Sequence, residues 1–271
     1  MAWAFAGATP LDSGYPSGFP DRRHRYAGEF GGWDGHRSRH QRWAKPVPAK
    51  VIRIATAADL EAMTWVLIGA APLDPVYPYR YPNRDLYTDE LFARMCSQKC
   101  VEYLDTSIVV VCEMDGRVVA FAAWDAPSPI RDRHRSAPLQ EPQPSVPSLP
   151  ITIGHERRMR AFRETCAASK RALFDAVYTA RGRQHMFLKI LLCHPDYQRR
   201  GAGRALTAWG IDEARRAGVD TTVFASPMGL ELYKKLGFKE VGRFRVQLEG
   251  EDVFLEIPAL VLSGEKRVTE G

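Results

Sequence analysis

The sequence lacks several features that would each define a class of protein. No apolar run approaches the roughly 20 residues that a membrane span needs, and the apolar start, Met1 to Leu11, has no basic segment of the kind that opens a signal peptide. The five cysteines are dispersed, and no second Cys pair or neighbouring His completes a zinc pattern. We therefore expect a cytoplasmic protein with reduced thiols, no metal site and no membrane partner.

A strong excess of one charge is also missing. The 271 residues include 38 Lys and Arg against 32 Asp and Glu, a net charge of +6. This mild excess favours phosphate-bearing ligands, but it is too small and too scattered to indicate nucleic acid. We expect no nucleic-acid partner, and both a monomer and a homodimer remain open.

Composition divides the chain into regions. Residues 1–48 are rich in Gly, Arg, His and aromatics and show no apolar period, which predicts a disordered arm. Residues 49–264 have the patterns of one folded domain, followed by a short tail, 265–271. Within the domain, 126–184 is predicted to be an insertion that holds a Pro-rich loop and a basic amphipathic helix.

Apolar periodicity predicts strands and helices along the folded part. The helix expected at 155–182 has an apolar stripe of Met159, Phe162, Cys166, Leu173 and Val177. The order predicts a mixed α/β sheet with helices on its faces. The expected elements are a strand at 50–55, a helix at 56–71, an irregular Pro-rich loop at 72–83, a helix at 84–105, a hairpin around Asp115-Gly116, the helix at 155–182, a strand at 185–195, a helix at 202–218, a strand at 219–225, a helix at 226–237 and a final strand pair at 238–262.

The stretch HPDYQRRGAGRA, residues 194–205, combines a strand end, two glycines and the start of a helix. The backbone N–H groups of about 199–204 have no intrahelical acceptor, and the helix dipole is positive there, so an anion is favoured. Gly201 and Gly203 have no Cβ and let a phosphate approach the backbone. Positive charge comes from Arg199, Arg200 and Arg204.

Two better-known phosphate loops do not fit this stretch. No Lys-Ser/Thr follows the glycines, as a P-loop requires, and Leu206 stands where a dinucleotide fingerprint needs Gly or Ala. The sequence therefore predicts a phosphate site of another kind.

Two motifs in order resemble the GCN5-related N-acetyltransferase (GNAT) superfamily. Gln198, Gly201 and Gly203 match its pyrophosphate loop, Q/R-x-x-G-x-G/A, after the typical lead-in Pro-Asp-Tyr. Further on, SPMGLELYKKLGFKEVG resembles the second motif, with Tyr233 and Gly237-Phe238 in its fixed positions. The resemblance covers about 50–262 and implies a mostly antiparallel central sheet flanked by helices, with a long insertion before the cofactor-binding strand.

The resemblance implies direct transfer of an acyl group from acetyl-CoA to an amine within a ternary complex. It assigns Tyr233 as the general acid that protonates the departing thiolate. The residues that it implies for the cofactor are Leu191, Leu192, Cys193, Gln198, Arg199, Arg200, Gly201, Ala202, Gly203, Arg204 and Ser226.

The general base is not identified by the resemblance. Phe187 and Lys189 occupy the strand positions where several members of the family carry a carboxylate or histidine, and Thr221 replaces the acid of protein N-terminal acetyltransferases. We take Asp125 and His185 as the replacements to test. Because that acid is missing, a protein N-terminus is less favoured as the acceptor.

The acceptor lies outside these motifs, and alternatives stay open. Tyrosines in the segment 74–87 suggest an aromatic pocket wall, and this segment with the long insertion resembles acetyltransferase-like proteins of filamentous fungi, which favours a small-molecule amine. One alternative is a covalent route through Cys193. Others are a tailoring enzyme that performs different chemistry on a thioester or polyketide-like substrate, and a non-catalytic CoA-binding module.

Overall fold

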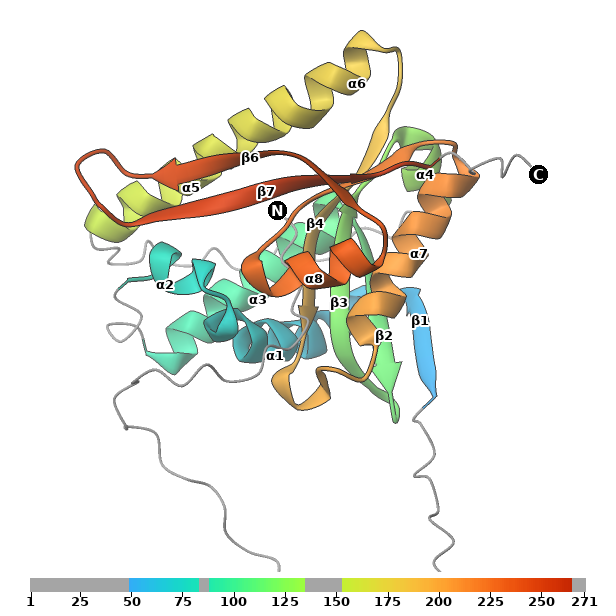
Figure 1. The fold of residues 1–271 in the computed structure, drawn as a ribbon. Helices are drawn as coiled ribbons and strands as arrows, with labels where there is room; N and C mark the ends of the chain where they lie inside the picture. The colour runs from blue at the N-terminus through green and yellow to red at the C-terminus, as the bar shows by residue number, and fades with distance from the viewer. Residues whose placement is uncertain (1–48, 83–87, 135–152, 265–271) are drawn as a thin grey trace, which may run out of the picture. The chain divides into compact units, whose positions relative to one another are not determined.

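The computed structural model describes residues 49–82, 88–134 and 153–264, which belong to one compact unit (Figure 1). The arm predicted at 1–48 and the tail at 265–271 lie outside the described residues. Most of the Pro-rich loop predicted within the insertion 126–184 lies outside them as well. The domain boundaries therefore stay predictions. Among the described helices, none has the length and apolar character to cross a membrane.

A seven-stranded sheet forms the centre of the fold, in the order β1-β2-β3-β4-β5-β7-β6 (Figure 1). Only β4 and β5 are parallel, and every other neighbouring pair is antiparallel. The predicted mixed, mostly antiparallel sheet is therefore confirmed. The strands are β1 (Lys50–Ile54), β2 (Ile108–Met114), β3 (Arg117–Asp125), β4 (His185–Cys193), β5 (Asp220–Phe224), β6 (Lys239–Gln247) and β7 (Phe254–Leu262).

The neighbouring strands β4 and β5 stop pairing part of the way along β4. Strand β4 pairs with β5 only from His185 to Leu188, whereas its ladder with β3 continues to Cys193. Within that ladder Ala123 lies opposite Ile190 but Trp124 opposite Leu188, so Lys189 is the extra residue of a bulge. The β5-facing edge of residues 189–193 therefore has no strand partner among the described residues, and its backbone groups are available to an added chain.

Helices cover both faces of the sheet and form two apolar cores (Figure 1). The first core lies under α1 and α3, and the second lies under α7 and α8. Gly210 lets α7 approach the sheet, because a Cβ there would lie 2.2 Å from the ring of Trp124. The helices are α1 (Leu60–Ala70), α2 (Val76–Arg80), α3 (Asp89–Thr106), α4 (Ser128–Arg133), α5 (Ile153–Lys170), α6 (Ala176–Ala180), α7 (Ala202–Arg216) and α8 (Pro227–Lys235).

Helix α2 corrects one expectation, because 72–83 was predicted to be wholly irregular. Its prolines do not prevent a short helix: Pro75 is the N-cap residue, and Pro78 lies in the first turn, where a backbone N–H has no intrahelical acceptor. Val76 and Tyr79 bury their side chains. The segment therefore packs on the first core instead of looping into solvent.

The helix predicted at 155–182 is present but changes phase. A π-helical turn, Arg171–Asp175, joins α5 to α6 and adds one residue to the repeat. Phe162 is buried as expected, but from the π turn onward Phe174 and Tyr178 are buried instead of the predicted Leu173 and Val177, and Val177 is 38% exposed. The rotated face packs on β4 and β5, where the Phe174 ring contacts Phe187 and Phe224, whereas α5 itself packs along β6 (Figure 1).

Candidate active site

The predicted phosphate loop follows β4 directly. After Cys193, a short 3₁₀ turn leads to Gln198, whose side-chain amide donates to the Cys193 carbonyl at 3.3 Å. Arg199 and Gly201 both have positive φ angles, 62° and 86°, and α7 begins at the next residue, Ala202. Left-handed residues separated in this way turn successive N–H groups toward a common side, as in backbone anion sites.

The start of α7 supplies donors without an internal acceptor. The N-cap residue is Gly201, which has no side chain to accept from the first amides. A Cβ at Gly203 would lie 3.6 Å from Leu232 and 3.7 Å from Leu191, so an alanine fits but a longer side chain would meet these leucines beside the loop. The loop therefore fits a pyrophosphate held against backbone amides.

The sequence analysis missed Lys50, at the start of β1. Its Nζ donates to the Arg200 carbonyl at 3.1 Å and would lie 2.9 Å from a Cβ at Gly201. A lysine at the positive end of a helix dipole is unfavourable by itself and becomes favourable when an anion binds there. No local signal identifies Lys50, because it is 150 positions from its partner.

The residues just before the phosphate loop pack against α1. The His194 ring stacks on Trp65 at 3.6 Å, and the Arg117 guanidinium lies over the same indole at 4.1 Å. Burial lowers the pKa of His194, so the stacked ring is neutral at pH 7. These contacts position the loop relative to the first core.

Tyr233 lies on α8, in the second predicted motif. Ser226 caps this helix by accepting from the Gly229 amide, and Pro227 occupies the first helical position, where a proline is well tolerated. The Tyr233 side chain is fully buried, and its hydroxyl has no hydrogen-bond partner in the described part of the chain. Burial, together with the charge of Asp74, raises its pKa well above 10, so the phenol keeps its proton.

Asp74, just before α2, is the second residue that the sequence analysis missed. Its carboxylate is 5% exposed and accepts from the Val76 amide at 2.9 Å. Burial raises its pKa to about 6, although the Val76 amide, the Arg80 charge and the Ser226 hydroxyl oppose the shift. One signal was available, because Asp74 is the only acid in the Pro- and Tyr-rich segment 72–83.

The fold brings Asp74 and Tyr233 into one buried electrostatic environment, since the Asp74 charge acts on the Tyr233 phenol. Burial raises the pKa of the Asp74 carboxyl to about 6 and the pKa of the Tyr233 phenol well above 10. At neutral pH the carboxylate is ionised and the phenol is protonated. A base and an acid held in these states can serve the two proton transfers of an acyl transfer.

The two predicted bases are engaged elsewhere. Asp125, at the end of β3, lies 3.5 Å from the Lys189 ammonium. His185 is held by the Asp175 carboxylate at 2.9 Å and the Thr222 hydroxyl at 2.7 Å, and burial lowers its pKa. Within the described residues, no contact joins Asp125 or His185 to Tyr233 or to the phosphate loop.

Cys193 ends β4 next to the phosphate loop, as the resemblance expects. Its side chain is 3% exposed, and burial raises its pKa to about 12. The thiol therefore keeps its proton at neutral pH, which argues against a covalent route. Across the described residues, no group of three His, Cys, Asp or Glu side chains could hold a metal ion.

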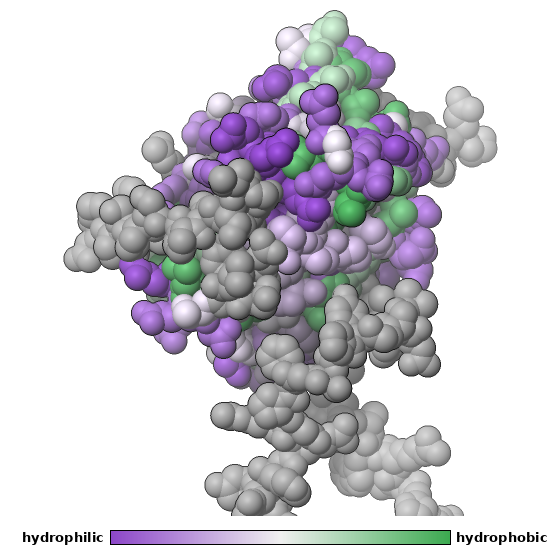
Figure 2. Space-filling model, turned by 90° about the vertical axis from the view of Figure 1, so that its left-hand side faces the viewer, coloured by the Kyte–Doolittle hydropathy of each residue, from purple (hydrophilic) through white to green (hydrophobic). Residues whose placement is uncertain are grey.

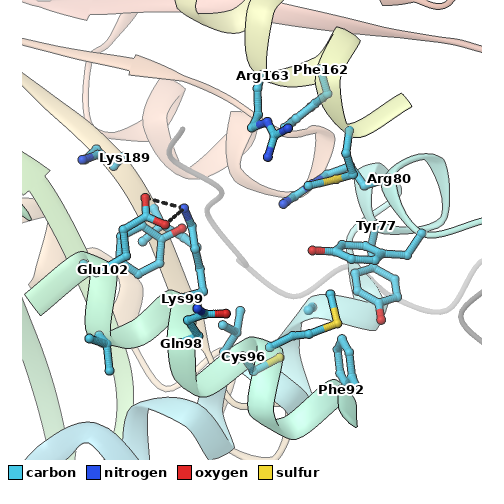
Figure 3. A pocket seen from close by; sticks show the side chains of 18 of the residues that line it. Tyr77, Arg80, Phe92, Cys96, Gln98, Lys99, Glu102, Phe162, Arg163 and Lys189 are labelled. Atoms are coloured by element: carbon cyan, nitrogen blue, oxygen red, sulfur yellow. Dashed lines mark hydrogen bonds and ion pairs between the residues drawn. The ribbon is translucent and has the colours of Figure 1, made fainter. Parts of the chain in front are cut away.

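A cavity of about 690 Å³ lies between α2, α3, α5 and β4 (Figure 3), a volume suited to a small molecule. Aromatic side chains of α2 and α3 line part of it, and charged side chains line the rest. The aromatic wall expected from the Tyr-rich segment is present. The lining includes Leu67, Tyr77, Arg80, Tyr81, Phe92, Cys96, Gln98, Lys99, Glu102, Tyr103, Met159, Phe162, Arg163, Lys189 and Ile190.

Comparisons with known proteins agree with this geometry. Residues 163–249 match the family model described as "Acetyltransferase (GNAT) domain". An acetyltransferase of Stachybotrys chartarum (strain CBS 109288 / IBT 7711) is 24% identical over 208 residues, which cover 75% of this chain and 86% of the relative.

Solved structures share the fold. The polyamine N-acetyltransferase of Drosophila melanogaster has a TM-score of 0.51 at 14% identity, covering 79% of this chain and 100% of that one. A mosquito arylalkylamine N-acetyltransferase-like protein, 5b, has a TM-score of 0.50 at 16% identity, with the same coverage of 79% and 100%. Both carry N-acetyltransferase in their names, and at these identities they show only that the architecture is shared.

In sequence over residues 163–249, and in the fold of its described residues, the chain is therefore similar to the GNAT acetyltransferases. It is an acyltransferase enzyme of the GNAT type, and acetyl-CoA is its acyl donor. The residues present fit that donor, since the loop offers glycine-lined amides for a pyrophosphate and Tyr233 offers a buried hydroxyl that no described residue hydrogen-bonds.

Lys50 carries the first prediction. Because its ammonium is held at the phosphate loop, Lys50→Gln is expected to raise the Kd for acetyl-CoA about tenfold, a typical loss for one charge-assisted contact to phosphate. Calorimetric titration at low and high salt measures this, with Lys50→Arg as the matched variant that keeps the charge. Equal affinities of all three proteins at low salt would show that Lys50 does not contact the donor.

Proposed function

We propose that this enzyme transfers the acetyl group of acetyl-CoA directly to the amine of a small molecule bound in the cavity. The observation that carries this proposal is the buried pair of Asp74 and Tyr233, one ionised and one protonated, beside the phosphate loop. Acetyl-CoA supplies an activated carbonyl and a thiolate leaving group.

The loop amides and Lys50 would hold the pyrophosphate, and the free edge of β4 at Leu191 to Cys193 would pair with the pantetheine arm. The apolar residues around β4 exclude water from the bond that breaks.

Asp74 would take a proton from the acceptor nitrogen. The nitrogen gains positive charge as it bonds to the carbonyl carbon, and its N–H then becomes far more acidic, within reach of a base whose pKa is about 6. As the carbon–sulfur bond breaks, Tyr233 would donate its phenolic proton to the departing sulfur. One proton is taken and one is given, so the products are the amide and CoA as its thiol.

This assignment replaces Asp125 and His185 as the proposed base. It also removes the main reason for a tailoring enzyme with different chemistry, since that alternative rested on a missing base. The names of the two solved relatives refer to polyamine and arylalkylamine acceptors, which supports a small amine here.

The test combines donor binding with an amine panel. Wild-type protein is expected to bind acetyl-CoA with micromolar Kd and to release CoA thiol when a suitable small amine is added. Gly203→Glu should weaken binding more than tenfold because it brings a carboxylate beside the phosphate loop, whereas Gly203→Ala, whose Cβ has room, should bind nearly as wild type.

Each outcome discriminates between the alternatives. Binding without turnover on any amine would favour the non-catalytic CoA-binding module. No binding by folded wild-type protein would contradict the donor site itself.

A further inference from the structure

The cavity contains more cationic than anionic groups. Arginine and lysine side chains enter it from α2, α3, α5 and β4, while its carboxylates come only from α3. The cations are Arg80, Lys99, Arg163 and Lys189, and the carboxylates are Glu102 and Asp105.

The two lysines already have carboxylate partners. Lys99 Nζ lies 2.7 Å from Glu102, the pair drawn with dashed lines in Figure 3. Lys189 Nζ lies 3.5 Å from Asp125 and donates to the Ser107 hydroxyl at 3.1 Å. By contrast, no carboxylate of the described residues lies within ion-pair distance of Arg80 or Arg163.

Arg80 is held rigidly without being neutralised. Its guanidinium lies 5.3 Å from the Tyr81 ring and 5.0 Å from the Phe162 ring, and its Nε donates to the Met159 sulfur at 3.5 Å. Aromatic and sulfur contacts fix the orientation of the group but leave the terminal N–H groups without a charged acceptor. Figure 3 shows Arg80 and Arg163 directing their nitrogens toward the middle of the cavity.

Arg80 also lies close enough to act on the proposed base. Its charge is one of the influences on the Asp74 carboxylate, and both residues belong to the segment around α2. Arg80 is thus the cationic residue of the cavity that also belongs to the segment carrying Asp74.

We propose that the acceptor is a primary amine that also carries a carboxylate, with Arg80 and Arg163 binding the carboxylate and Tyr77, Phe92 and Phe162 packing on an apolar or aromatic body. The guanidinium fork matches a carboxylate in two parallel hydrogen bonds, which a plain amine cannot provide. Placement of the amine at Asp74 rests on the proposed function; recognition of the carboxylate does not.

Matched pairs test the proposal by turnover. Phenylalanine, tyrosine, tryptophan and leucine are compared with their decarboxylated amines in the presence of acetyl-CoA. We expect at least one amino acid to exceed its amine about tenfold or more in kcat/KM, since a charged pair with the guanidinium forms only with the carboxylate. Arg80→Gln should remove that preference mainly through KM, whereas Arg94→Gln, an exposed arginine of α3 outside the cavity lining, should retain it.

A binding measurement decides the question without turnover. The N-acetyl products of the same pairs are titrated calorimetrically into wild-type, Arg80→Gln and Arg94→Gln proteins with CoA present. Tighter binding of the carboxylates, lost only in Arg80→Gln, supports the proposal. Equal or tighter binding of the decarboxylated products, or no binding of any carboxylate, overturns it. If carboxylates bind and nothing is acetylated, the proposed function fails while the recognition site stands.

Discussion

Asp74→Asn is expected to lower kcat by about 10²–10⁴ at pH 7.5, the usual loss when a general base is removed. Asparagine keeps an oxygen that can accept from the Val76 amide, so the local backbone is retained. In the wild type, kcat/KM should fall as the pH drops below about 6, where the carboxylate becomes protonated. The variant should lose this limb of the pH profile.

The same substitution should stabilise the protein at neutral pH. The pKa of Asp74 is raised from 3.8 to about 6 by burial, so ionisation at pH 7 costs the folded state on the order of 1–3 kcal/mol. Between about pH 4 and 6 the folded state binds more protons than the unfolded state, and wild-type stability therefore falls as the pH rises through this window. The Asp74→Asn variant has no buried charge at this position. Its Tm should therefore exceed the wild-type Tm most at pH 7, and the difference should vanish below about pH 4.

Thermal unfolding across pH 4–8 and pH–rate profiles on the same samples measure both effects. A variant that gains stability and loses activity identifies a buried carboxylate kept for chemistry. A variant with wild-type kcat would exclude Asp74 as the base and return attention to Asp125 and His185.

The second large effect on kcat is expected for the substitution Tyr233→Phe. Loss of the general acid is expected to reduce kcat by about 10²–10⁴ with little change in the Kd for acetyl-CoA. Because the Tyr233 hydroxyl is buried and has no partner among the described residues, its removal should leave the free energy of unfolding unchanged or increased.

Tyr178→Phe is the matched control. Tyr178 is also buried, but its hydroxyl donates to Asp220 at 2.8 Å. That variant should lose about 1–3 kcal/mol of stability, because a buried carboxylate loses a donor, while keeping kcat. Single-turnover acetylation and thermal unfolding separate the two tyrosines. If Tyr233→Phe retained wild-type kcat, the thiolate would have to be protonated by another group.

The sequence by itself determined the features that depend on near neighbours. The positive φ of Gly201, the Ser226 cap and the Asp115-Gly116 hairpin follow from what individual residues allow their own backbone to do. The order of the elements follows from the period of apolar residues. Together they predicted the sheet, the phosphate loop and the helix that carries Tyr233.

Only the tertiary structure decided the remaining parts of the site. The π-helical turn moved burial from Leu173 and Val177 to Phe174 and Tyr178, a shift that a constant 3.6-residue period cannot show. The short helix α2 turned an apparent loop into part of the cavity wall.

Several polar side chains of the site interact with residues that are far away in the sequence and come close only when the chain folds. Lys50 reaches the carbonyl of Arg200, and Asp74 acts on Tyr233. No local pattern encodes such pairs, because the distance between two side chains depends on how the whole sheet twists and which helices cover it. Burial then sets their pKa values, and burial exists only in the folded chain.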